Sequence, residues 1–281
     1  MDNFEQEKYD ILKKTYKSHI LNSNLKQYTL TVFLTDLCNL NCTNCQAYCG
    51  SISPYTMPFD LLKKNLLTLK KNLDFCDGIV FIGGEPLLHP NIKEICKWTR
   101  LNFPNIPISI FTNGIKFAEW DDNDFNLLKL NNIKILVTLY PTQFCINNIK
   151  NLEKKCKEKS IEFEIHGIRP YFSKTSLNFN GSNNPDARFF SCCHADYPPS
   201  LFLKEDKIFH CNVLHSFFQY LPNMEIFAID YITIQDLKIN GVQKLKKLCS
   251  EPNESCKYCG LLMSTTQYEN FCSDEIIFWN T

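Results

Sequence analysis

Residues 28–45 read YTLTVFLTDLCNLNCTNC. The first eight of them are rich in β-branched and aromatic side chains, which predicts a strand. Three cysteines with the spacing C-x3-C-x2-C follow this strand: Cys38, Cys42 and Cys45. We therefore expect three thiols in the loop at the carboxyl end of the first strand.

Downstream of this loop, the sequence alternates between helical and strand patterns. Leu62, Leu66, Leu69 and Leu73 recur at helical spacing behind Pro58, which suits a helix start. Strands are predicted at 78–82, 107–111, 133–139 and 161–165, and helices at 91–101, 120–130 and 147–159. This alternation predicts a parallel sheet with five strands, in a barrel or a doubly wound fold. Residues 166–190 are too irregular for a sixth strand to be assigned.

The amino-acid composition of the chain changes after Gly181, where Asn, Pro and Ser residues cluster. The segment LFLKEDKIFHC (201–211) predicts two short strands around a Glu205-Asp206 turn, and a helix is predicted near 242–248. We expect three parts: a helical N-terminal extension (1–27), an α/β domain (28–185) and a small C-terminal module (186–281).

Composition excludes several classes of partner. Lys and Arg number 30, as do Asp and Glu, so no basic field is available for nucleic acid or an anionic membrane. The charged start MDNFEQEKYDILKK lacks the apolar core of a signal peptide, and no later run approaches the ~18 apolar residues of a membrane span. We therefore expect a cytoplasmic protein, in which 15 cysteines are not explained by disulfides. The scattered cysteines read as small buried hydrophobes: Cys76, Cys96, Cys145 and Cys156.

The cysteines at 38, 42 and 45 call for a different interpretation. Three closely spaced thiolates can hold one face of a cubane iron–sulfur cluster and leave one iron without a protein ligand. An open iron can bind a small molecule, by the logic that separates open from closed zinc sites. Part of a zinc site is the alternative.

A second motif, Gly83-Gly84-Glu85-Pro86, follows the second predicted strand. Glycines permit close backbone approach, and Glu85 offers an anion to an ammonium group. Together with the cysteine spacing, this resembles the radical S-adenosylmethionine (SAM) superfamily, over roughly residues 28–170. The resemblance implies a partial (β/α)6-type TIM barrel, a catalytic [4Fe-4S] cluster on the three cysteines, and a GGEP motif that binds the methionine amine of SAM.

The same resemblance implies further site residues at strand ends. Thr112, Asn113 and Thr138 match polar positions used around the SAM ribose and carboxylate, and Arg169 is a candidate catalytic residue that could pair with that carboxylate or with substrate. Asn44 departs from the family, which usually has an aromatic residue there near the adenine. Cys49 is not a family ligand; we interpret it as structural, with a hydrogen donor as the alternative.

The C-terminal cysteines surround the predicted hairpin and helix. Their order resembles the twitch domain, a shortened relative of the SPASM domain, which carries one auxiliary [4Fe-4S] cluster. The implied ligands are Cys193, Cys211, Cys256 and Cys259, although Cys192 or Cys249 could enter the set. A four-cysteine zinc site is the alternative. We leave the neighbouring His194, His210 and His215 out of the ligand set.

These resemblances imply an enzyme that reductively cleaves SAM to a 5'-deoxyadenosyl radical and takes a hydrogen atom from a substrate. An electron donor such as flavodoxin or ferredoxin would be needed. The short single-cluster module favours a dehydrogenase, an oxidoreductase acting on a sugar, polyol or cyclitol, with a weaker link to surface polysaccharides. The alternatives are a peptide-modifying epimerase or crosslinking enzyme, and a non-catalytic iron–sulfur or zinc scaffold.

Overall fold

The computed structural model describes most of the chain between residues 28 and 258. The described residues are 28–40, 54–73, 76–140, 143–168, 171–173, 199–211, 230–258 and 268–270, with single positions 10, 14, 42, 45, 47, 49, 184, 185 and 189. They form two compact units. Unit 1 combines Met1–Leu30, Asp60–Cys76 and Thr175–Thr265, and unit 2 combines Thr31–Phe59, Asp77–Lys174 and Thr266–Thr281. The expected three-part division stays a prediction.

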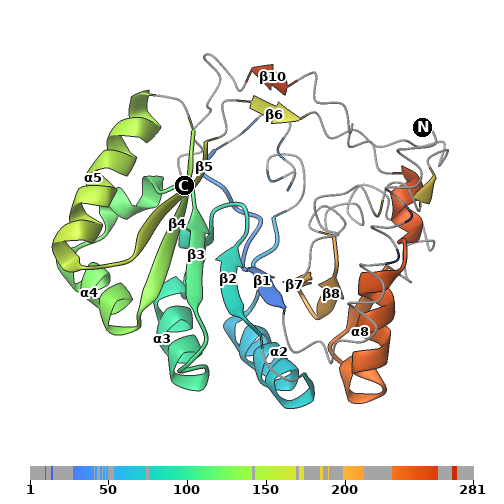
Figure 1. Cartoon of the computed structure of the whole chain (residues 1–281). Coiled ribbons are helices and arrows are strands. Elements are labelled where there is room, and N and C mark those ends of the chain that lie inside the picture. The colour runs from blue at the N-terminus through green and yellow to red at the C-terminus, as the bar shows by residue number, and fades with distance from the viewer. Residues whose placement is uncertain are drawn as a thin grey trace. The chain divides into compact units, whose positions relative to one another are not determined.

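Unit 2 is built on a parallel sheet (Figure 1). Its strands lie side by side in the order β1 (Thr29–Phe33, whose first two residues belong to unit 1), β2 (Gly78–Ile82), β3 (Ile108–Thr112), β4 (Ile133–Leu139) and β5 (Phe163–Ile168). The pairs from β2 to β5 are parallel, with Ile110 opposite Ile135 in the centre. The predicted α/β class and the five predicted strands are confirmed.

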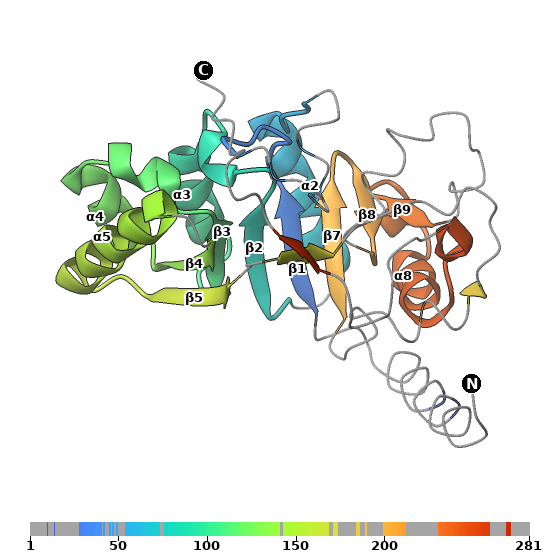
Figure 2. The same ribbon diagram turned by 90° about the horizontal axis from the view of Figure 1, so that it is seen from above.

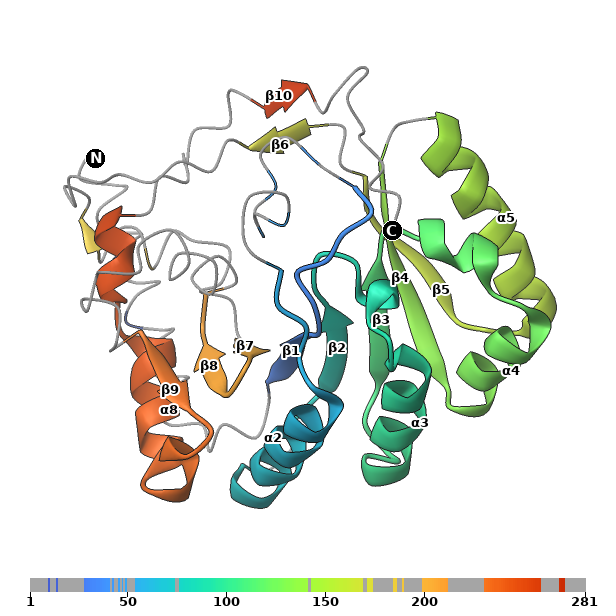
Figure 3. The same ribbon diagram turned by 180° about the vertical axis from the view of Figure 1, so that it is seen from behind.

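Helices cover one face of this sheet (Figures 2 and 3). They are α3 (Ile92–Asn102), α4 (Asp122–Leu130) and α5 (Gln143–Lys159). On β4 the side chains of Ile133, Ile135 and Val137 are buried while those between them are partly exposed, as expected for a strand with one covered face. None of the described helices is long and apolar enough to cross a bilayer.

The expected sixth strand does not join the parallel sheet within the described residues. β6 (Tyr171–Ser173) instead pairs antiparallel with β10 (Tyr268–Asn270). Two residues separate β5 from β6, too few for the crossover that a parallel strand needs. Among the described strands of unit 2, the sheet is therefore open, and closure of a six-stranded barrel is not shown.

Unit 1 contains the predicted hairpin and helices. Its elements are α2 (Phe59–Asn72, from Asp60 onward), β7 (Ser200–Lys204), β8 (Lys207–Phe209), β9 (Tyr231–Thr233) and α8 (Gly241–Ser250). β7 and β8 pair antiparallel around Glu205, which has φ 53° at the turn. Asn65 of α2 donates a hydrogen bond of 2.6 Å to the Glu205 carbonyl and so joins helix to hairpin.

Candidate active site

The three cysteines of the first group lie in the loop that follows β1, as their sequence position predicts. All three are partly buried, and none of them forms a disulfide. The Cys45 amide donates to the Cys42 carbonyl over 3.2 Å, which forms a turn, and the Cys38 sulfur accepts from the Leu40 amide at 3.4 Å. We call residues 36–49 the cysteine loop.

The start of the cysteine loop is fixed by hydrogen bonds to the chain that returns from it. The Asp36 amide donates to the Tyr55 carbonyl over 2.7 Å, and the buried Asp36 carboxylate accepts from the Tyr55 amide at 3.3 Å. The hydroxyls of Thr35 and Thr56 share a bond of 2.8 Å. The loop therefore leaves the sheet from a defined position.

The GGEP turn packs directly against the cysteine loop. The Gly84 amide donates to the Thr35 carbonyl and the Glu85 amide to the Leu37 carbonyl, each over 2.7 Å. A Cβ atom on Gly83 would lie 2.3 Å from the Thr35 oxygen, and one on Gly84 would lie 2.4 Å from the Leu37 oxygen. The two glycines therefore permit close approach of this turn to the cysteine loop.

Glu85 is fully buried at the end of this turn. Its Oε1 accepts from the Thr112 hydroxyl at 2.7 Å and from the Leu87 amide at 3.1 Å, and its Oε2 accepts from the Asn113 amide at 2.8 Å. Burial raises the Glu85 pKa to about 7, against the opposing effect of these three bonds. A nearby cation would favour the ionised form of this carboxyl group.

Glu85 also influences the first cysteine. Burial, and then the charge of Glu85, raises the pKa of the Cys38 thiol to about 12. A metal ligand must be deprotonated, so metal binding here would release protons. No three His, Cys, Asp or Glu side chains of the described residues converge on one metal ion. A four-iron cluster does not need such convergence, because each thiolate binds a different iron. A donor set of three cysteine thiolates fits such a cluster.

Two of the other predicted SAM contacts, Thr112 and Asn113, lie beside Glu85. Thr112 is the last residue of β3 and Asn113 follows it, and both are hydrogen-bonded to Glu85. Pro86 and Thr138 are buried, the latter beside an irregularity in the β4–β5 pairing. Arg169 and Asn44 lie outside the described residues. The roles of all these side chains toward SAM stay predictions.

Tyr140 is a site candidate that the sequence analysis missed. It directly follows β4, and burial raises the pKa of its phenol, as do the nearby thiols of Cys42, Cys38 and Cys45. The phenol therefore remains a hydrogen-bond donor beside the predicted cluster ligands. Its position at the carboxyl end of a parallel strand is the signal that could have identified it.

Cys49 lies against the predicted ligands. A hydrogen bond between the Cys49 and Cys45 side chains raises the Cys49 pKa, and burial acts in the same direction. Cys38 and Asp36 are also close enough to raise it. Its place near the three cysteines agrees with either of the interpretations given above.

The second cysteine group is described only in part. Cys211 follows β8, and Cys256 lies in the short helix η5 (Glu254–Tyr258), whose first amides are capped by Asp230. Cys193 and Cys259, with Cys192, lie outside the described residues. Burial in α8 raises the Cys249 pKa to about 12, which favours a structural role for that thiol. The auxiliary ligand set stays a prediction.

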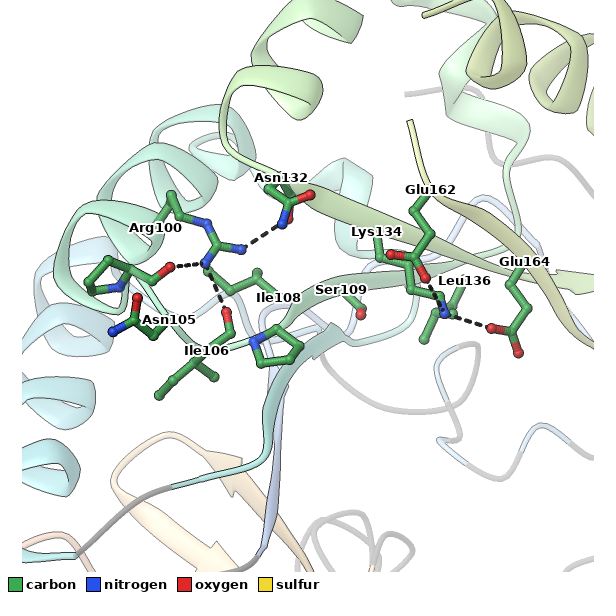
Figure 4. Close-up of a pocket in the computed structure, with 12 residues that line it drawn as sticks. Arg100, Asn105, Ile106, Ile108, Ser109, Asn132, Lys134, Leu136, Glu162 and Glu164 are labelled. Atoms are coloured by element: carbon green, nitrogen blue, oxygen red, sulfur yellow. Dashed lines mark hydrogen bonds and ion pairs between the residues drawn. The ribbon is translucent and has the colours of Figure 1, made fainter. Parts of the chain in front are cut away.

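A cavity of about 520 Å³ opens at the amino ends of β3 and β4 (Figure 4), whereas Thr112 lies at the carboxyl end of β3. Its charged groups are already engaged. Lys134 forms ion pairs with Glu162 at 2.8 Å and Glu164 at 2.7 Å. Arg100 donates to the carbonyls of Asn131, Phe103, Pro104, Ile106 and Asn132. We interpret these groups as structural.

Comparison with known proteins supports the interpretation of unit 2. Residues 32–141 match the Radical SAM superfamily, a range that includes the cysteine loop, the GGEP turn and β4. A GTP 3',8-cyclase of Desulforamulus reducens is 28% identical over 53% of this chain and 47% of its own. A 7,8-dihydro-6-hydroxymethylpterin dimethyltransferase of Methanocaldococcus jannaschii is 33% identical over 30% of this chain and 16% of its own. The matches thus span less than half of these relatives.

One solved structure resembles the chain over most of its length. The crystal structure of BtrN in complex with AdoMet and 2-DOIA matches with a TM-score of 0.50 and 17% identity, covering 89% of this chain and 98% of BtrN. At this identity the likeness supports the fold alone.

Proposed function

We propose that this chain is a radical SAM dehydrogenase that oxidises a sugar, polyol or cyclitol. The observation that carries the proposal is the contact between the cysteine loop and the GGEP turn: the Glu85 amide bonds to the Leu37 carbonyl, one residue before Cys38. A carboxylate suited to an ammonium group is thereby fixed beside three thiols suited to a cluster. The match of residues 32–141 to the Radical SAM superfamily supports the same chemistry.

In this proposal the residues of unit 2 bind and orient SAM. Cys38, Cys42 and Cys45 would hold a [4Fe-4S] cluster, and Glu85 would receive the SAM ammonium group, whose charge favours the ionised carboxylate. When bound, the cluster and SAM would supply the one-electron cleavage that yields a 5'-deoxyadenosyl radical. Thr112 and Asn113 keep the Glu85 oxygens in place through their hydrogen bonds.

The proposed net reaction is a two-electron oxidation. An alcohol carbon would give up one hydrogen atom, and then one electron and one proton, to become a carbonyl. The electron needs an acceptor, which is the proposed role of an auxiliary cluster on Cys193, Cys211, Cys256 and Cys259. The proposed substrate class rests on the short C-terminal module, and BtrN, crystallised with AdoMet and 2-DOIA, shares only the fold, over 89% of this chain.

The first test is SAM cleavage by anaerobically reconstituted protein supplied with a flavodoxin or ferredoxin system. Wild-type protein should form 5'-deoxyadenosine, and C38A/C42A/C45A should not. Substrates deuterated at each carbinol carbon should transfer deuterium into 5'-deoxyadenosine. Cleavage without transfer from any sugar, polyol or cyclitol, but with transfer from a peptide, would favour the peptide-modifying alternative.

A second test counts metal ions. Two clusters require about eight irons per chain, and C193A/C259A should retain about four. Zinc bound in the C-terminal module would contradict the auxiliary cluster. Zinc together with no SAM cleavage would favour a scaffold protein.

A further inference from the structure

Asn113 forms hydrogen bonds through its backbone amide and through both polar atoms of its side chain. Its amide donates to Glu85 Oε2 at 2.8 Å, and its side-chain Nδ2 donates to Asn39 Oδ1 at 2.8 Å. Its Oδ1 accepts from the Ile115 amide at 3.0 Å. Because that amide can only donate, it fixes which side-chain atom is oxygen and directs Nδ2 at Asn39.

Asn39 lies next to Cys38 in the cysteine loop. The bond from Asn113 therefore spans 74 residues of sequence and connects the end of β3 to the first predicted cluster ligand. Asn113 is 6% exposed and Asn39 is partly exposed, so the bond is partly shielded from water. The same residue thus contacts the predicted amine-binding carboxylate through its main chain and the cysteine loop through its side chain.

We propose that Asn39 and Asn113 are a positioning pair that sets the cysteine loop at a fixed distance from Glu85. SAM has to reach the open iron and Glu85 at the same time, so a shift of one relative to the other would weaken SAM binding without removing any SAM contact. This inference rests on the proposed function. Neither side chain needs to touch SAM for the pair to act.

The test measures equilibrium SAM binding to reconstituted, oxidised protein, per mole of cluster. N39A and N113A should each weaken SAM binding about tenfold, the size expected for loss of one part-buried hydrogen bond. Both variants break the Asn113–Asn39 bond, and N113A also breaks the bond from the Ile115 amide, so N39A/N113A should bind SAM no more weakly than N113A alone. N39D keeps an acceptor for Asn113 Nδ2 and should bind within about threefold of wild type.

N102A is the matched control, because Asn102 makes a side-chain bond to the Trp98 carbonyl within α3. It should bind SAM as wild type does. The reduced cluster gives a second measurement: addition of SAM should change its EPR spectrum less completely in N39A and N113A at a fixed SAM concentration.

The outcomes separate this inference from the proposed function. Wild-type protein that neither binds nor cleaves SAM overturns the proposed function and the inference with it. If wild-type protein cleaves SAM, and N39A and N113A bind SAM as tightly as N102A does, the positioning pair is wrong but the proposed function stands. The positioning pair is also wrong if the losses of SAM affinity add up in the double variant, or if N39D binds SAM as weakly as N39A. If N39A loses its cluster, the proposed pair requires that N39D keep the cluster and bind SAM with nearly the wild-type affinity.

Discussion

The hydroxyl of Thr112 donates a hydrogen bond of 2.7 Å to Oε1 of Glu85, and both side chains are buried. The same hydroxyl accepts from the Gly114 amide at 2.9 Å, so it also stabilises the turn after β3. T112V keeps the shape but removes both bonds. We expect it to lower the free energy of unfolding of metal-free protein by about 1–3 kcal/mol at pH 8, where Glu85 is ionised.

Urea unfolding of metal-free protein measures this loss, and T68V is the matched control. Thr68 donates to the Lys64 carbonyl at an exposed position of α2, so its replacement should change the free energy by less than about 0.5 kcal/mol. Equal losses in the two variants would contradict a special role for the Thr112–Glu85 bond.

The fold was largely predictable because its signals are local. β2 and β4 have the predicted bounds, 78–82 and 133–139, since both are short runs rich in β-branched residues. The sixth strand was not predictable, because the partner of β6 is β10, about a hundred residues later. Pairing over such a separation leaves no local pattern.

The candidate site was predictable in its residue types but not in its connections. The motifs identified Glu85 and the cysteines, yet nothing in their spacing says that Asn113 bonds to Asn39. Tyr140 carries no motif at all, and only the fold brings it near the cysteine thiols. Such contacts depend on how strand ends meet in space, which residue order does not specify.

The raised pKa of Glu85 makes the stability of metal-free protein depend on pH. Glu85 has a pKa of about 7 in the folded chain, against 4.5 for the unfolded reference. Between these values the native state holds a proton that the unfolded state has lost, so stability falls as pH rises from about 4.5 to 7. The shift amounts to about 3 kcal/mol.

E85Q removes the titrating group and should remove this slope. The difference in unfolding free energy between wild type and E85Q, measured by urea unfolding from pH 4 to 8, should move by about 3 kcal/mol in favour of E85Q as pH rises. The pH dependence is the diagnostic quantity, because the new amide also disturbs the bond from the Asn113 amide. A difference that stays constant across this range would show that Glu85 titrates normally.

Arg100 should matter for stability and not for catalysis. Its guanidinium donates to five backbone carbonyls, which lie between α3 and β3 and between α4 and β4. A lysine ammonium cannot reach all five. R100K should lower the free energy of unfolding by about 2 kcal/mol. K154A, at an exposed ion pair of α5, should change it little.

The same variant tests the interpretation of the cavity in Figure 4. Below its unfolding temperature, R100K should form 5'-deoxyadenosine with the kcat and KM of wild type. A raised KM for substrate in R100K, with SAM affinity unchanged, would instead make the cavity a substrate site.

Thr99 offers a stabilising substitution. It lies fully buried on α3, and its hydroxyl is the buried side-chain group that has no hydrogen-bond partner within the described residues. A buried hydroxyl without a partner costs free energy, whereas valine has the same shape and a similar helix propensity. T99V should therefore raise the free energy of unfolding by about 1 kcal/mol. T99S is the matched control, because it keeps the hydroxyl, removes the methyl group and should lower stability. If T99V proves as unstable as T99S in urea unfolding, the hydroxyl has a partner, such as a buried water molecule, and the assignment is wrong.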